Sequence, residues 1–347
     1  RFERMGVRVI REAGRFVSED TVEAGDHRIT ARRIVIATGS RPFVPPVEGI
    51  EDVPYLTNET LWELRERPEH LLVIGGGPIG MEMAQAHRRL GCAVTVIEGA
   101  KALGKDEADF AAVVLDRLRS EGIEIVEGAQ VTAARRSDTG VVLETEDGRT
   151  FAGSHLLVAV GRKANTEALD LAKAGIGTTK TGVKVDDSLR TANRKVYAIG
   201  DAAGGLQFTH VAGYHASVVV RSAVLGLPAK ARTNHLPWCT YTKPELAHVG
   251  LTEQQARRQH GMAVRVTEFD YADNDRAVTE AETTGKIKVV VAHGKPVGVS
   301  IVGHQAGELI ALWSMAIANG VKMRQVAAMV APYPTYAEIN KRVAGAH

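Results

Sequence analysis

Three glycines at a fixed spacing and one acidic residue are the clearest candidates for chemistry in this sequence. Gly75, Gly77 and Gly80 form the pattern G-x-G-x-x-G, and Glu98 follows about 20 residues later. Such glycines allow a tight turn, close approach of the backbone to a pyrophosphate, and close packing of a helix on a strand, while the acid can bind a ribose hydroxyl. The spacing therefore predicts a dinucleotide site. The alternative is a glycine-rich turn that holds no ligand.

The sequence around this motif supplies the elements that would position it. An apolar run from Leu71 to Ile74 is typical of a buried strand, and a second apolar run from Ala93 to Ile97 ends at Glu98. A helix between the two strands would direct its N-terminal N–H groups and its dipole at the phosphates. The β-α-β-α-β pattern is completed by a helix over residues 107–120, strands over 123–126 and 156–160, and a hairpin at Asp147-Gly148.

Two other strand ends carry residues that could contact a ligand. An apolar strand over 34–36 leads into Ala37-Thr38-Gly39, where backbone can lie against a ligand, although a turn without function is favoured on this segment alone. A second strand, 196–199, leads into Gly200-Asp201. Asp201 could accept hydrogen bonds from sugar hydroxyls or cap the next helix, and the local sequence favours neither reading. His210 and His215 have no further ligands at fixed spacing, so no metal site is predicted.

The outer parts of the chain have a different character. Short strands are expected within residues 7–36, including one over 7–10, and a helix over 61–67 is expected before a domain boundary near residue 65. From about residue 233 we expect an α+β domain, which often forms a subunit interface. Its expected elements are a loop over 240–248, helices over 252–259, 308–318 and 323–330, and antiparallel strands over 264–269, 287–291 and 297–302.

Composition limits the classes of function. The hydrophobic content of 44% is ordinary for a soluble globular protein, and the net charge of +2 argues against a nucleic-acid-binding or membrane surface. The longest apolar runs have the length of strands, so no membrane span is expected. Cys92 and Cys239 are the only cysteines and lie far apart, which excludes a CxxC site and a disulfide framework within this sequence. A reducing, cytoplasmic setting is expected.

Taken together, the motifs resemble those of the pyridine nucleotide-disulfide oxidoreductases, flavoenzymes that include dihydrolipoamide dehydrogenase and mercuric reductase. The resemblance extends over essentially the whole chain and is specific for the family rather than for a substrate. The matching segments, in family order, are Ala37-Thr38-Gly39, GGGPIGME (75–82), AVGRKANT (159–166), AIGDAAG (198–204) with FTHVA (208–212), and APYPTYAE (331–338).

This resemblance implies an α/β fold with Rossmann-type FAD- and NAD(P)-binding domains and a C-terminal α+β dimerisation domain. Chains of the family open with an FAD-binding G-x-G-x-x-G and a redox-active C-x4-C pair, and neither is present in this sequence. We therefore expect a fragment of a longer chain. The expected parts are the rear of the FAD domain (1–64), the NAD(P) domain (65–162), the return of the FAD domain (163–232) and the dimerisation domain (233–347).

The resemblance also implies roles for individual residues. Glu98 would bind the adenosine ribose and favour NADH over NADPH, although Lys101 and Lys105 are near in sequence. Glu82 would face the contact between nicotinamide and flavin, where the family pairs the matching acid with a lysine. The family often has an aromatic lid at the position of Pro78. The implied cofactor contacts are Gly75, Gly77, Pro78, Ile79, Gly80, Glu98 and Gly161, together with Thr38, Gly39, Gly200, Asp201, Phe208, Thr209 and His210 on the FAD side.

The segment APYPTYAE departs from the disulfide reductases of the family. These enzymes have a histidine at the position of Tyr333, paired with an acid that matches Glu338, and the histidine passes a proton to the thiol pair across the dimer interface. A tyrosine, with a reference pKa of about 10, is a poor proton relay at neutral pH. Mercuric reductases share the tyrosine but usually end in a cysteine pair that this sequence lacks. Tyr333 is equally well read as a packing residue of the interface.

The expected protein is a homodimeric, FAD-dependent oxidoreductase. Hydride would pass from NADH, or less readily NADPH, to flavin and then to a disulfide, metal or other small acceptor. The candidates for catalysis are Glu82, Tyr333 and Glu338. The alternative is a truncated chain that binds NAD and dimerises but holds no stable flavin and has no catalytic activity. A reductase of a protein electron carrier ranks lower, since such enzymes lack the APYPTYAE segment.

Overall fold

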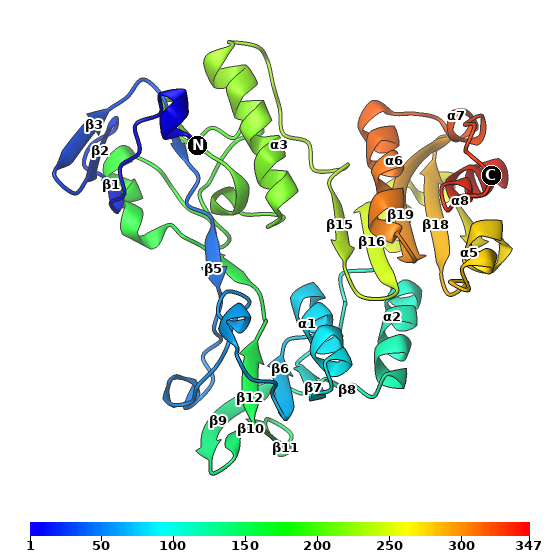
Figure 1. Ribbon diagram of the computed structural model, residues 1–347. Coiled ribbons are helices and arrows are strands. Elements are labelled where there is room, and N and C mark those ends of the chain that lie inside the picture. The colour runs from blue at the N-terminus through cyan, green and yellow to red at the C-terminus, as the bar shows by residue number, and fades with distance from the viewer. The chain divides into compact units, whose positions relative to one another are not determined.

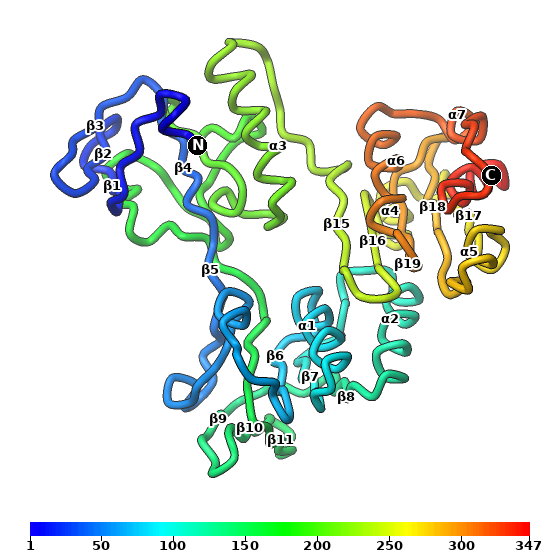
Figure 2. Tube along the Cα trace, viewed as in Figure 1, coloured from blue at the N-terminus to red at the C-terminus, as the bar shows by residue number.

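A computed structural model describes residues 1–347, and the chain forms two compact units (Figures 1 and 2). One unit contains Arg1–Arg41 and Arg162–Arg232, and the other contains Pro42–Gly161 and Thr233–His347. Each unit is therefore assembled from segments that are far apart in sequence. The predicted dinucleotide fold and the predicted dimerisation domain belong to the same unit. The functional identity of the four predicted domain ranges stays a prediction.

The first unit contains a small antiparallel sheet of three strands, β1 (Gly14–Phe16), β2 (Thr21–Ala24) and β3 (His27–Thr30), with β2 in the centre. Phe16 and Ala24 are buried beneath it. The strand expected over residues 7–10 is not formed, so that expectation is wrong. Residues 7–10 have no neighbouring strand to complete their backbone hydrogen bonds, and their side chains are largely exposed.

A parallel pair of strands forms the second element of this unit. Strand β4 (Ile34–Ile36) pairs in parallel with β14 (Val196–Ala198), so that Ile34 lies beside Val196 and Ile36 beside Ala198. Because parallel strands end at the same edge, the turns that follow β4 and β14 lie next to each other. Helix α3 (Thr209–Val219) follows the second turn and continues into a π-helical turn, Val220–Val224.

The second unit begins with a Rossmann-type sheet. Four parallel strands are arranged in the order β12-β6-β7-β8, with α1 (Pro78–Arg89) joining β6 to β7 and α2 (Ala108–Ser120) joining β7 to β8 (Figure 1). The apolar runs form these strands because helices cover one face of the sheet and a second sheet covers the other. The strands are β6 (His70–Ile74), β7 (Ala93–Glu98), β8 (Glu124–Glu127) and β12 (His155–Val158).

That second sheet is antiparallel and contains the expected hairpin. Its strands are β9 (Val131–Ser137), β10 (Gly140–Thr145) and β11 (Thr150–Gly153), with Asp147-Gly148 in the turn between β10 and β11. Val141 and Leu143 of β10 pack on Leu72 and Ile74 of β6 in one apolar core. The predicted β-α-β-α-β pattern is thereby confirmed in its order of elements.

The C-terminal part of the second unit is an antiparallel sheet in the order β15-β16-β19-β18-β17, covered by helices. Its core centres on Trp313, which is fully buried and donates from Nε1 to Asn340 Oδ1 at 2.7 Å. The elements are β15 (Pro237–Thr240), β16 (Glu245–Gly250), α4 (Glu253–His260), β17 (Val264–Asp270), α5 (Asp275–Thr279), β18 (Lys286–Ala292), β19 (Lys295–Gly303), α6 (Ala306–Asn319), α7 (Met323–Ala327) and α8 (Glu338–Gly345).

Two sequence expectations in this unit are wrong, and the C-terminal helices differ from those expected. The loop expected over 240–248 contains strand β16 and the end of β15, because Pro244 and the polar residues near it occupy only the connecting turn. The helix expected over 61–67 is a single 3-10 turn, Leu61–Glu63, since Leu61 is the only fully buried residue of the segment and Trp62 stays exposed. The C-terminal helix α8 was not expected, and α7 is shorter than expected. None of the helices has the length and apolar character needed to cross a membrane.

Candidate functional site

The turn between β6 and α1 needs glycine at each motif position for a different physical reason. Gly75 has φ of +109°, and a Cβ there would lie 2.6 Å from the carbonyl oxygen of Ala159. A Cβ on Gly80 would collide with the carbonyl oxygen of Gly75. Such a collision would prevent the close packing of α1 on β6 that glycine allows. No atom lies within 4 Å of the position that a Cβ on Gly77 would take. The space beside the Gly77 backbone is thus open, as close approach of a pyrophosphate requires.

The sheet order places this turn at the point where ligands bind in open α/β sheets. The connection after β6 leads away to β7 on one side, while β12 lies on the other side of β6. Ligands bind outside the carboxyl ends of the strands at such a change of direction. Helix α1 begins with Pro78, and Pro78, Ile79 and Gly80 form its first turn, whose N–H groups are available to an anion apart from that of proline. Gly161, in the segment after β12, has φ of +134° and open space beside its Cα.

Glu98 lies at the end of β7 and is held in place by the glycine turn itself. Its Oε2 accepts a hydrogen bond from the Gly76 N–H at 2.6 Å, and its Oε1 accepts one from the Ala100 N–H at 2.8 Å. A carboxylate has about four lone-pair sites, so two bonds leave acceptor capacity for hydroxyl groups. The structure therefore brings together the predicted glycines and the predicted acid.

The residues expected to contact FAD lie at the adjacent ends of β4 and β14 in the first unit. Gly39 has φ of +66° with open space beside it, and Thr38 Oγ1 donates to the carbonyl oxygen of Asn165 at 2.7 Å. Asp201 Oδ2 accepts a hydrogen bond from Ser40 Oγ at 2.6 Å, and Ser40 Oγ accepts one from Arg162 Nε at 2.7 Å. The carboxylate of Asp201 is therefore oriented by a chain of side chains from the neighbouring strand ends.

The start of α3 completes this group. Phe208 and His210 stack with their ring centroids 5.3 Å apart, and Thr209 is the first residue of the helix. Gly200 has φ of +57°, and its N–H donates to His215 Nδ1 at 3.2 Å. Burial lowers the pKa of His215, which keeps the ring neutral and able to accept that bond. Open glycine backbone beside an oriented carboxylate fits the contacts that part of a flavin nucleotide would need.

Glu82 lies on α1 beyond the motif and contacts the C-terminal part of the same unit. Its Oε1 accepts a hydrogen bond from the Tyr241 N–H at 2.9 Å, in the turn between β15 and β16. Burial raises the pKa of Glu82, and the hydrogen bond from Tyr241 only partly offsets that effect. The Tyr241 side chain itself is 70% exposed. The structure thus places the predicted acid where α1 contacts the turn between β15 and β16.

Gln85, one helical turn after Glu82, fastens the same turn to α1. Its Oε1 accepts from the Lys243 N–H at 2.7 Å, and its Nε2 donates to the Lys243 carbonyl oxygen at 2.9 Å. Gln85 is almost completely buried, so these bonds replace water. Sequence reasoning missed Gln85 and Tyr241. The only available signal was the spacing of Gln85 from Glu82, which places both on one face of a helix.

A second missed group surrounds Cys239 on β15. Asp106, in the loop after β7, accepts a hydrogen bond from Trp238 Nε1 at 2.8 Å, and burial raises the pKa of Asp106 to about 6. Burial and the nearby carboxylates of Glu245, Glu82 and Asp106 raise the pKa of Cys239 well above its usual value. A thiol in such surroundings stays protonated and is a poor nucleophile.

The other two candidates for catalysis form a separate group near the C-terminus. Tyr333 is 72% exposed, and a hydrogen bond with Asp275 raises its pKa, with a smaller contribution from the charge of Glu338. Glu338 begins α8 and its Oε2 accepts from the Thr335 N–H at 3.3 Å. The structure brings Tyr333 and Glu338 near each other, while the polar partner of Glu82 lies in the turn after β15.

Comparison with known proteins agrees with this geometry. The family model described as pyridine nucleotide-disulphide oxidoreductase matches residues 1–216, and the model of that family's dimerisation domain matches residues 236–344. These matches confirm the resemblance drawn from the motifs. They also confirm the α/β fold class with a C-terminal dimerisation domain.

Individual relatives point to the same group. Mercuric reductase from Lysinibacillus sphaericus is 36% identical over 337 residues, which cover 95% of this chain and 62% of that protein. Dihydrolipoyl dehydrogenase from Bacillus subtilis is 32% identical over 342 residues, covering 96% of this chain and 74% of that protein. LpdA from Mycobacterium tuberculosis superposes with a TM-score of 0.91 at 28% identity, covering 99% of this chain and 78% of that one.

A copper(II) complex of the HOCl-induced flavoprotein disulfide reductase RclA from Escherichia coli superposes with a TM-score of 0.89 at 29% identity. That match covers 97% of this chain and 78% of the other. The chain spans less than two thirds of several of the mercuric reductases it matches, including 62% of the Lysinibacillus protein and 54% of one from Bacillus cereus.

Proposed function

The chain belongs to the pyridine nucleotide-disulphide oxidoreductase family, and we propose that it acts as an FAD-dependent oxidoreductase with NADH as the electron donor. Its relatives include proteins named mercuric reductase, dihydrolipoyl dehydrogenase and flavoprotein disulfide reductase. The electrons would pass on to a thiol, metal or other small acceptor. The proposed assembly is a homodimer through the C-terminal domain, and the proposed location is the cytoplasm.

The observation that carries this proposal is the open space beside the Gly77 backbone, near the carboxylate of Glu98, which hydrogen bonds hold in place. The glycine turn and the first turn of α1 would hold the pyrophosphate of NADH through backbone N–H groups. Glu98 would accept hydrogen bonds from the adenosine ribose. The negative charge of Glu98 would repel the 2′-phosphate of NADPH, which supports NADH as the preferred donor.

The FAD side is supported by the strand-end group of the first unit. Gly39 and the Gly200–Ala203 turn would offer backbone to the nucleotide, and Asp201, oriented by Ser40, would accept hydrogen bonds from hydroxyl groups. When bound, FAD supplies the site that accepts hydride from the nicotinamide and releases electrons to the acceptor. The work of this chain is to hold both nucleotides, orient them and exclude water.

Glu82 is proposed as the acid nearest to the nicotinamide. It lies on the helix whose first turn would bind the pyrophosphate, and the Tyr241 N–H orients its carboxyl group. Burial of this carboxyl group raises its pKa above the usual value of a glutamate. Tyr333 and Glu338 are proposed to act at the interface between subunits. The pKa of Tyr333 is raised, so its hydroxyl would stay protonated and act as a hydrogen-bond donor.

Substitution of Glu98 tests the nucleotide assignment. Glu98→Gln and Glu98→Arg remove the carboxylate, and loss of a charge-assisted hydrogen bond should weaken NADH binding at least about tenfold. Glu98→Arg should also improve binding of NADPH, because the guanidinium can pair with its phosphate. Glu144→Gln serves as the matched control, since the Glu144 side chain on β10 is 39% exposed, and it should leave both affinities unchanged. Unchanged affinities for both nucleotides in the Glu98 variants would refute the assignment.

A further inference from the structure

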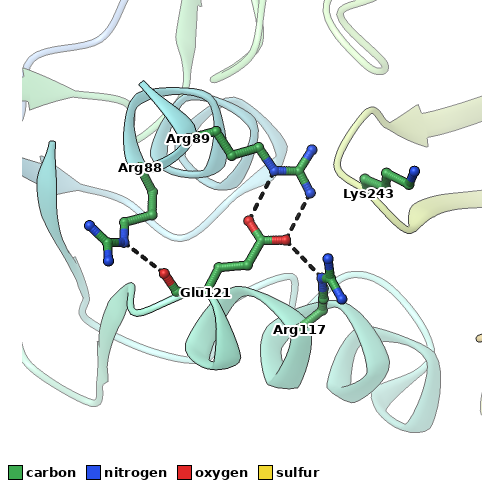
Figure 3. A pocket seen from close by; sticks show the side chains of 5 residues that line it. All are labelled: Arg88, Arg89, Arg117, Glu121 and Lys243. Carbon is green, nitrogen blue, oxygen red and sulfur yellow. Dashed lines mark hydrogen bonds and ion pairs between the residues drawn. The ribbon is translucent and has the colours of Figure 1, made fainter. Parts of the chain in front are cut away.

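A cationic cleft lies at the far end of α1 from the glycine turn. It has a volume of about 540 Å³ and lies where the ends of α1 and α2 meet the turn between β15 and β16 (Figure 3). Pro78 and Arg89 are the first and last residues of α1, so about 16 Å of helix separates the cleft from the predicted pyrophosphate site. The cleft is lined by Arg88, Arg89, Arg117, Glu121 and Lys243.

Two arginines share one carboxylate at the centre of this cleft. Figure 3 shows that the guanidinium groups of Arg89, on α1, and Arg117, on α2, both point toward the carboxylate of Glu121. Arg89 binds both carboxylate oxygens, at 2.8 and 3.0 Å, and Arg117 Nε binds one of them at 2.7 Å. The hydrogen bond with Arg89, followed by that with Arg117, lowers the pKa of Glu121 to about 2. Both guanidinium groups are thereby fixed in position.

Positive charge remains in excess after every ion pair is counted. Lys243 is balanced by Glu282 at 2.6 Å, whereas Arg89 and Arg117 have only Glu121 between them. Arg88 donates to main-chain oxygens, those of Glu121 at 2.7 Å and Cys92 at 3.2 Å, and has no carboxylate among these partners. The cleft therefore carries a surplus of two positive charges. The C-terminal dipoles of α1 and α2 offset about half a charge each, which leaves the cleft cationic.

The fixed arginines keep unused donors that face solvent. A guanidinium has five N–H donors, and Glu121 engages two of Arg89 and one of Arg117. The two side chains are 42% and 52% exposed, so a ligand can reach them. Forked donors in fixed geometry suit oxyanions that carry several charged oxygens, because each guanidinium can form paired hydrogen bonds.

We propose that this cleft binds a small multivalent anion of the polyphosphate class. The ligand would bridge Arg89 and Arg117 on their solvent side, with Lys243 contributing attraction from the opposite wall. This binding does not depend on the proposed redox function, because none of the lining residues belongs to the dinucleotide or flavin groups. Gln85 joins Glu121, at 3.3 Å, to the Lys243 main chain, so a bound anion would also restrain the turn that holds Glu82.

Titration calorimetry with tripolyphosphate at low ionic strength tests the proposal, with saturating NAD⁺ present to fill the dinucleotide site. The wild-type protein should bind one tripolyphosphate per chain. Arg89→Gln and Arg117→Gln should each weaken binding at least about tenfold, and added salt should weaken it further. The exposed, paired residues Arg135 and Arg257 provide the matched controls, and their glutamine variants should bind as the wild type does.

Two further variants keep the test independent of folding. Lys243→Gln leaves the hydrogen bonds of Glu121 with Arg89 and Arg117 intact and should weaken binding several-fold, with an unchanged circular dichroism spectrum. Glu121→Gln removes the internal competitor for the arginines and should strengthen binding, an outcome that a merely disrupted cleft would not give. Bound tripolyphosphate should also slow amide exchange at residues 241–243.

Three results would overturn the site. The first is that the wild-type protein does not bind tripolyphosphate, and the second is that NAD⁺ displaces it. The third is that the Arg89 and Arg117 variants bind tripolyphosphate with the same affinity as the wild type. Weaker binding by Glu121→Gln would overturn the role assigned to its carboxylate. Any of these outcomes can occur while flavin reduction by NADH is intact, so failure of this site and failure of the proposed function are distinguishable.

Discussion

Substitution of Lys288 by methionine tests how the dinucleotide fold is joined to the C-terminal sheet. Lys288 lies on β18 with its side chain only 7% exposed, and its Nζ lies over the ring of Phe110 on α2. Four carboxylates from both parts of the unit surround this ammonium group. Its distances to them are 3.2 Å for Asp109, 3.4 Å for Glu268, and 3.8 Å for each of Glu107 and Glu253.

The expected loss follows from leaving these carboxylates with less positive charge. Breaking a buried ion pair by removing one partner costs about 3–5 kcal/mol. Asp109 and Glu268 are 44% and 40% exposed, so solvent screens part of this cost, and we expect about 3 kcal/mol for Lys288→Met. Lys286 pairs with Asp109 and Glu268 but is 22% exposed. The matched variant Lys286→Met should therefore cost only about 1 kcal/mol.

The loss should also depend on pH in a defined direction. Burial alone would lower the pKa of Lys288, but its hydrogen bond with Asp109 and the surrounding carboxylates raise that pKa overall. A lysine with a raised pKa in the folded state contributes its full stability below its ordinary pKa of about 10.4. This contribution is lost as the pH rises through the folded-state pKa. The difference between wild type and Lys288→Met should therefore shrink in strongly alkaline solution.

Urea denaturation followed by tryptophan fluorescence measures the effect at neutral pH. Amide exchange then shows whether α2 and β18 lose protection together, as the shared ion pairs require. Equal or smaller destabilisation by Lys288→Met than by Lys286→Met would refute this reasoning, because burial of Lys288 would then have no energetic consequence.

Two smaller predictions concern the groups that sequence reasoning missed. Gln85→Ala should leave the Lys243 N–H and carbonyl without their partners and lower the free energy of unfolding by about 2–4 kcal/mol. Amide exchange at residues 241–243 should become faster. Unchanged exchange there would contradict the bridging role of Gln85. Asp106→Asn should stabilise the protein at neutral pH by about 2 kcal/mol, because burial raises the pKa of Asp106 from 3.8 to about 6 and its ionisation opposes folding. In the wild type, protonated Asp106 contributes its full stability below about pH 4, and this contribution is lost as the pH rises through about 6. The variant lacks this pH dependence. Free energies of unfolding measured across this pH range test the sign.

The sequence was most informative where function imposes a local constraint. Gly75, Gly77 and Gly80 lie in one turn and the helix after it, so the sequence alone could predict the site that they form. Glu98 could be predicted as part of this site because it ends the next strand. The structure adds that Glu98 also anchors the turn through the Gly76 N–H. The expectation for residues 7–10 failed because a strand needs a neighbour, which alternation of side chains does not provide.

Contacts between distant segments were beyond sequence reasoning. Strand β16 was missed because it carries His248, a polar residue that is buried at 1% exposure. Its ring is satisfied by Ser300 at 2.8 Å and packs against Trp238, and neither partner is near in sequence. The partners of Glu82 and Asp106 likewise come from β15 and the turn after it. A buried polar group of this kind has no periodic signature, since its partner determines its cost.

The central claim is that this protein passes electrons from NADH to a bound flavin. Anaerobic titration of the purified protein with NADH, followed by visible absorbance of the flavin, tests it most directly. The account predicts FAD at one per subunit, loss of the oxidised flavin band in proportion to added NADH, and a requirement for higher concentrations of NADPH. Protein that binds NADH but retains no flavin, or whose flavin stays oxidised under excess NADH, would contradict the account.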